Sequence, residues 1–96
     1  MSHHFKSDIS QLIQIDACKF QAIAAPRNYY NVQVTIDTGI KMKRIKIEFK
    51  VLDRKFYWET QSIPNGGTSV YTFPRVVNEK QLSSGKVVIE GVITAL

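Results

Sequence analysis

The basic residues of this 96-residue chain gather in one stretch, residues 41–55 (KMKRIKIEFKVLDRK). The stretch holds seven of the thirteen lysines and arginines and only two acids, so its formal charge of +5 equals that of the whole chain. Lysine and arginine side chains form strong hydrogen bonds with carboxylates and phosphates, so the chemistry predicted here is the binding of an anionic group. The alternative is a solvated strand face whose lysines keep the sheet soluble. The candidate binding residues are Lys41, Lys43, Arg44, Lys46, Lys50, Arg54 and Lys55.

Catalytic chemistry is much harder to place in this sequence. Cys18 is the only cysteine, and the only histidines are His3 and His4, near the N-terminus. A nucleophilic thiol needs a base beside it, and a single cysteine forms no internal disulfide, so Cys18 is predicted to be a buried, unreactive thiol. No glycine-rich phosphate loop, zinc-type Cys/His spacing or H-E-x-x-H motif occurs. We therefore expect no enzyme, with no catalytic residue, metal site or cofactor.

An alternating pattern places the basic stretch on a β-strand. Apolar side chains occupy every second position from Ile45 to Val51, and Lys46, Glu48 and Lys50 lie between them. This is the period of a strand with one buried face. The strand is therefore expected to supply both a core-facing row and a basic, solvent-facing row.

Residues 29–37 alternate in the same way, and a turn after them would pair this strand with the basic strand. Counting outward from the turn puts Val34 opposite Arg44, whereas one extra residue at 43–44 puts it opposite Ile45. A slip of one residue turns a whole strand face over. We therefore expect a hairpin with a bulge at 43–44.

The remaining segments also favour strands. Residues 9–24 fit either a helical face or an alternating strand, and the pattern of the rest favours a strand with a bulge near Ala17–Cys18. Residues 1–8 are expected to be a flexible tail before a single β domain at 9–96. Further strands are expected at 56–63, at 68–73 with Pro74 as the stop, and at 86–96, with one helical turn possible in the loop 78–86. Six or seven short antiparallel strands predict a small β-sandwich, and an OB-type barrel of five strands is the alternative.

The segment Phe49–Asp53 (FKVLD) resembles the F-x-L-Y-D signature of FxLYD-type immunoglobulin-like domains, with valine and leucine in place of the leucine and tyrosine. A preceding strand of alternating apolar residues, a proline- and glycine-marked turn at 63–66 and the downstream Phe73 match the surroundings of that signature. The resemblance covers about residues 30–75. It implies an immunoglobulin-like sandwich used for display or binding, with no active site to carry over.

Two functions from different classes fit these features. The first is a protein-interaction or structural module whose basic strand faces an acidic partner, either another protein or a second copy of the chain. The alternative is a protein that binds single-stranded nucleic acid, with basic side chains along the phosphates and exposed rings stacked on bases. The candidate stacking residues are Tyr57, Trp58 and Tyr71, although the aromatic run 56–58 does not show which face of the strand each one occupies.

The sequence also bears on location. No apolar run reaches the roughly 18 residues that indicate a membrane-spanning helix. The first ten residues lack the apolar segment of a secretion signal. We therefore expect no membrane span and a cytoplasmic protein.

Overall fold

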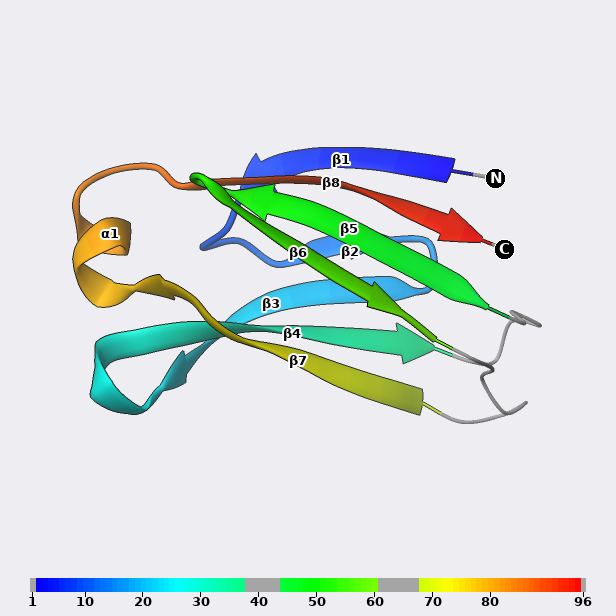
Figure 1. The fold of residues 1–96 in the computed structure, drawn as a ribbon, viewed down its shortest axis with the longest axis horizontal. Coiled ribbons are helices and arrows are strands. Elements are labelled where there is room, and N and C mark those ends of the chain that lie inside the picture. Colours follow the sequence, from blue (N-terminus) through cyan, green and yellow to red (C-terminus); the bar gives the residue numbers. More distant parts are fainter. Residues whose placement is uncertain (1, 38–43, 61–67, 96) are drawn as a thin grey trace.

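Two antiparallel sheets of four strands each form the described part of the chain, which is residues 2–37, 44–60 and 68–95 of a computed structural model. One sheet has the order β1-β8-β5-β6 and the other β2-β3-β4-β7 (Figure 1). The strands are β1 (Ser2–Asp8), β2 (Ile13–Ile15), β3 (Cys18–Ala25), β4 (Tyr29–Asp37), β5 (Ile45–Val51), β6 (Arg54–Glu59), β7 (Thr68–Asn78) and β8 (Val88–Ala95). A 3-10 turn (Pro26–Asn28) joins β3 to β4, and the helical turn α1 (Glu79–Ser83) lies between β7 and β8.

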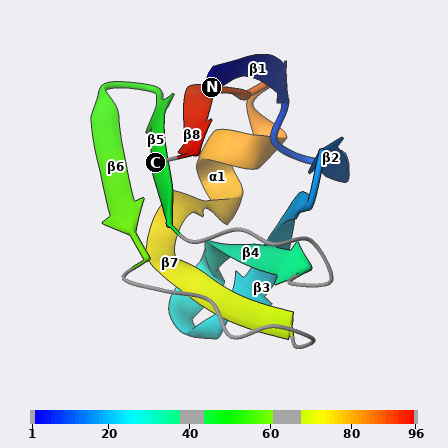
Figure 2. The ribbon, with the colours of Figure 1, turned by 90° about the vertical axis from the view of Figure 1, so that its right-hand side faces the viewer.

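The two sheets face each other across a core of alternating apolar side chains. Both β4 and β5 bury every second residue along most of their length, as their alternation predicts. In Figure 2, a view along the strands, β6 and β7 form one side of the sandwich and β1 and β2 the other. The prediction of a small antiparallel β-sandwich is confirmed, and these strands do not close into the five-stranded barrel. The described residues contain eight strands rather than six or seven.

The N-terminal residues are a strand where a flexible tail is predicted, so that prediction is wrong for Ser2–Asp8. β1 pairs with β8 along its whole length. Phe5 is buried, and its ring centroid lies 4.9 Å from that of Phe20. The polar composition of the segment conceals the strand, because an edge strand of an antiparallel sheet needs apolar residues on one face only. Here one phenylalanine supplies most of that face.

The predicted hairpin between residues 29–37 and the basic strand is also wrong. β4 pairs with β3 and β7, whereas β5 pairs with β6 and β8, so the two strands belong to different sheets. The predicted facing is nevertheless correct, since Val34 and Ile45 are both fully buried in the same core. Residue 43 of the predicted 43–44 bulge lies outside the described residues, and the ladder that required a bulge there does not exist.

Most of the segment 9–24 is extended, as favoured over the helix, but residues 9–11 form a turn and two strands follow, β2 and β3. The predicted bulge near Ala17–Cys18 is instead the turn of the β2-β3 hairpin. Asp16 in this turn has a φ of 51°, a left-handed conformation that aspartate tolerates better than most residues. A tight turn and a bulge both interrupt the alternation, so the phase slip in the sequence does not distinguish them.

β7 continues past Pro74, where the strand is predicted to stop. The register between β4 and β7 shifts between Tyr30 and Val32, and Arg75 has a φ of 50°. The side chain of Asn31 accepts a hydrogen bond from the backbone nitrogen of Arg75 at 2.9 Å. A bulge is one of the few places where a strand accommodates proline. This one lets β7 resume pairing beyond Pro74.

The strand order differs from that of immunoglobulin constant domains. In those domains the first two strands are neighbours in one sheet, whereas here the first strand pairs with the last, β8. The two folds therefore share the sandwich architecture and differ in connectivity.

Candidate functional site

The solvent-facing side of the sheet β1-β8-β5-β6, called the outer face below, carries most of the charged side chains that the sequence singles out. The strand register aligns these side chains in rows that cross all four strands. The lysine row is Lys6, Glu90, Lys50 and Lys55. The tyrosine row is His4, Val92, Glu48 and Tyr57. A third row is Ser2, Thr94, Lys46 and Glu59.

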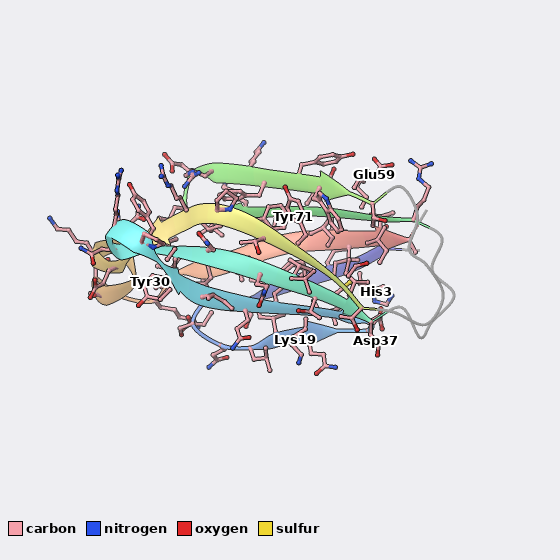
Figure 3. The ribbon with its side chains drawn as sticks, turned by 90° about the horizontal axis from the view of Figure 1, so that it is seen from below. His3, Lys19, Tyr30, Asp37, Glu59 and Tyr71 are labelled. Carbon is pink, nitrogen blue, oxygen red and sulfur yellow. The ribbon has the colours of Figure 1, made fainter. Side chains whose placement is uncertain are left out.

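Glu59, at the end of β6 (Figure 3), accepts hydrogen bonds from two neighbours. The Arg44 guanidinium donates to one of its carboxylate oxygens, and the Tyr57 hydroxyl donates to the other at 2.6 Å. The hydrogen bond from Tyr57, and then that from Arg44, lowers the pKa of Glu59. The same bond to the carboxylate raises the pKa of Tyr57. Arg44 is therefore already engaged within the protein.

The other two carboxylates of these rows also have basic partners. The Lys46 ammonium lies 3.6 Å from the Glu48 carboxylate, and the Lys6 ammonium lies 3.9 Å from that of Glu90. The Lys6–Glu90 pair is exposed and the Lys46–Glu48 pair is half-buried at the surface, so both contribute little to stability. They do cancel most of the local charge, so Lys46 is a weak candidate for binding an external anion.

Lys50 and Lys55 carry the positive charge that remains on this face. They lie directly opposite each other on β5 and β6, and both are exposed. Within the part of the chain that the structure describes, neither forms an ion pair. Like charges opposite one another in a sheet repel. An anionic group placed between these two ammonium groups would relieve that repulsion.

A depression of about 580 Å³ lies beside this pair of lysines. The lysine row contributes Lys50, Lys55 and Glu90 to its wall, and the tyrosine row contributes His4, Val92 and Tyr57, among others. Its position follows from the register, because the side chains of two neighbouring rows stand up on either side of the strand backbones. The lysines thus border a shallow hollow whose other side combines apolar side chains with the Glu48 carboxylate.

The three predicted stacking residues are not brought together on this face. Trp58 and Tyr71 stack on each other with ring centroids 4.6 Å apart and planes at 18°. Figure 3 shows Tyr71 on β7, so this pair joins the edges of the two sheets. Trp58 points to the core side, since it lies opposite the buried Ile47. Tyr57, with 57% of its surface exposed, is the stacking candidate that lies on the outer face.

Arg54, another predicted binding residue, serves the fold instead. Its guanidinium donates to the backbone carbonyl oxygens of Arg75 and Val76, the second at 3.3 Å. It also lies over the Phe56 ring, 4.9 Å from the centroid. Arg54 therefore links β6 to the bulged part of β7. Lys41 and Lys43, the remaining predicted binding residues, lie outside the described residues.

Cys18 is buried as predicted, with 1% of its surface exposed. Burial, and secondarily the charge of Asp16, raises the pKa of its thiol from 9.0 to about 11. Because the thiolate is the reactive species, we expect no reaction with a thiol reagent at pH 8 in the native state, and one thiol per chain to react in denaturant. The absorbance of the chromophore that the thiol reagent releases measures the reaction in the native state and in denaturant. Fast native labelling would contradict the assigned burial.

Lys6, Glu90 and Val92 are the site residues that the sequence analysis misses. Alternation in 86–96 puts Glu90 and Val92 on one face of the last strand. The sequence carries no signal that this strand lies beside β5, or that β1 lies beside it in turn. These residues join the site only through the strand pairing.

Metal ligands do not gather in the described ranges, where no group of three histidine, cysteine, aspartate or glutamate side chains could hold an ion. His3 contacts Asp16, with 2.9 Å between its Nε2 and the carboxylate Oδ2, which ties β1 to the turn of the β2-β3 hairpin.

Within the described residues, no helix has the length and the apolar composition needed to span a bilayer.

No protein-family model matches this chain, and neither a curated protein nor a solved structure matches it.

Proposed function

We propose that this protein is a non-catalytic interaction module whose outer face binds an acidic segment of a partner protein. The observation that carries the proposal is the pair Lys50 and Lys55. These lysines lie opposite each other without an ion pair in the described residues, whereas Glu48, Glu59 and Glu90 on the same face each have a basic partner. The resemblance of residues 49–53 to FxLYD-type domains favours the same kind of use, display or binding.

A protein partner fits this face better than single-stranded nucleic acid. A polyphosphate chain favours a continuous cationic groove and several exposed rings. Here the basic side chains alternate with three carboxylates, and Tyr57 is the one stacking candidate on the face. A single carboxylate can be held between Lys50 and Lys55, on the side of Lys50 that faces away from Glu90. The acidic segment could also belong to a second copy of the chain, which would show as a concentration-dependent molecular mass.

The test is a binding titration by fluorescence anisotropy with a labelled glutamate-rich peptide and, separately, a labelled thymidine oligonucleotide. We expect the peptide to bind the natural chain, with weaker binding at higher salt. The double variant Lys50→Glu/Lys55→Glu should bind it at least about tenfold more weakly, because opposing like charges across an interface cost several kcal/mol.

The matched control is Lys19→Glu/Lys80→Glu, which changes the net charge equally. Lys19 is exposed on β3 of the other sheet, and Lys80 is exposed on α1. Equal losses in the two double variants would mean that only net charge matters and would contradict the site. Tighter binding of the oligonucleotide, lost in Lys50→Glu/Lys55→Glu, would favour the nucleic-acid alternative.

A cytoplasmic location belongs to this proposal. Reducing conditions there would keep the buried thiol of Cys18 free, as the structure has it.

A further inference from the structure

The hollow beside Lys50 and Lys55 has two chemically different sides. The lysine row borders it with two ammonium groups that have no ion-pair partner in the described residues. The tyrosine row borders it with the side chain of Val92 and the ring of Tyr57, and the Glu48 carboxylate lies between these two. Tyr57 is among the most exposed large apolar side chains of the described residues. A ligand that fills the hollow therefore meets two ammonium groups without an ion pair on one side and, on the other, two apolar side chains that flank one carboxylate.

From this geometry we infer that the partner segment is an extended peptide with an acidic residue and, two positions away, a large apolar residue. This inference rests on the proposed function above. Neighbouring rows are two residues apart along each strand, which is about 6.6–6.8 Å. An extended peptide lying along the strands projects residues i and i+2 toward the sheet with the same spacing. Its carboxylate would lie between the lysines on β5 and β6, and its apolar side chain would lie in the next row against the Tyr57 ring, with Val92 on the far side of Glu48.

Two contacts of the tyrosine row affect which kind of side chain can bind beside it. The Tyr57 hydroxyl is held by Glu59, in the row farther from the lysines, so the phenol is tethered on that side and its ring remains beside the hollow. The Glu48 carboxylate has its partner, Lys46, in that same farther row. Its negative charge would still repel a second acid at this position, and such repulsion gives specificity. An acid-x-apolar peptide should therefore bind better than an acid-x-acid peptide.

The experiment compares four capped, labelled peptides that differ only at two positions: Glu-x-Phe, Glu-x-Ser, Glu-x-Glu and Ser-x-Phe. The expected order places Glu-x-Phe first, about tenfold tighter than Glu-x-Ser, because an apolar group in a hydrophobic contact contributes at least that much. Ser-x-Phe should bind weakest, since it lacks the carboxylate that engages both lysines.

The variant Val92→Thr/Tyr57→Ser separates the two sides of the hollow. It should reduce the preference for Glu-x-Phe over Glu-x-Ser to near unity. The matched control is Val70→Thr, at a valine that is 54% exposed on β7 of the other sheet, and it should retain the full preference. Circular dichroism checks that both variants are folded. Amide NMR shifts on adding Glu-x-Phe should include residues 50, 55, 57 and 92.

Each alternative outcome has a distinct meaning. Equal affinities for Glu-x-Phe and Glu-x-Ser would overturn the inference and leave the proposed function standing. Binding of none of the acidic peptides, or binding only of the thymidine oligonucleotide, would overturn both. A preference that survives in Val92→Thr/Tyr57→Ser would place the apolar contact elsewhere and overturn the inference as stated.

Discussion

Gly91→Ala is expected to lower the free energy of unfolding by about 3 kcal/mol or more, although it adds only one methyl group. Gly91 lies in β8 between two phenylalanines, opposite Phe5 on β1 and Phe49 on β5. A Cβ at this position would lie 2.2 Å from the backbone oxygen of Glu48 and 2.6 Å from Cβ of Phe49. The oxygen belongs to the neighbouring strand, so relief of this clash requires the β5-β8 ladder to shift.

Urea denaturation followed by circular dichroism measures this effect. The control is Glu90→Ala, the preceding residue on β8, which faces solvent and forms an ion pair with the exposed Lys6. It should change the stability by no more than about 0.5 kcal/mol. Equal stabilities of Gly91→Ala and Glu90→Ala would show that the two strands are farther apart at Gly91 than the structure places them.

Gly91 also explains how the inner face of this sheet is filled. The row that crosses the four strands there is Phe5, Gly91, Phe49 and Phe56. The rings of Phe49 and Phe56 stack with centroids 5.0 Å apart, and Phe5 packs on Phe20 instead. A residue without a side chain leaves room for the large rings on both of its neighbours. The backbone of Gly91 also borders the hollow on the outer face.

Val34→Asp is expected to unfold the protein. Val34 is 0% exposed, near the middle of β4, with Phe20 and Tyr71 as its ladder neighbours. A carboxylate there has no basic partner in the core and loses its hydration, so the cost exceeds about 4 kcal/mol. That is close to the whole stability of a marginal domain. Far-UV circular dichroism and a thermal melt give the measurement.

The control for this substitution is Thr35→Asp, the next residue on the same strand. Thr35 is on the solvent side and lies opposite Lys19, so its carboxylate would stay hydrated beside a positive charge. We expect a folded protein with nearly unchanged stability. A native spectrum and a native melting temperature for Val34→Asp would mean that the side chain reaches water and that β4 faces the other way.

The sequence by itself determined which side of most strands is buried. In β4 and β5 the apolar residues recur at every second position, and Val34 and Ile45 are in the core as predicted. Alternation has this power because side chains of a strand point to opposite faces in turn. Alternation gives no signal where a segment is mostly polar, as in β1, in which Phe5 is the buried residue.

The choice of strand partners was decided only by the tertiary structure. The alternating pattern indicates that β5 has a buried face. Because β4, β6 and β8 each have such a face too, the pattern does not indicate which of them pairs with β5. The chain changes sheets between β4 and β5, and β5 lies between β6 and β8. Facing follows from local sequence, whereas pairing depends on which distant strands bury their apolar faces together.

The candidate site divides in the same way. The concentration of positive charge in residues 41–55 can be counted in the sequence. Which of these charges remain available could not be counted, because Glu59 on β6 pairs with Arg44 and Arg54 turns to the backbone of β7. Charge is a property of each residue, but neutralisation is a property of the residues brought beside it. Among the residues that the structure describes, Lys50 and Lys55 are the cations at the hollow without an ion-pair partner. Only the assembled sheet decides this.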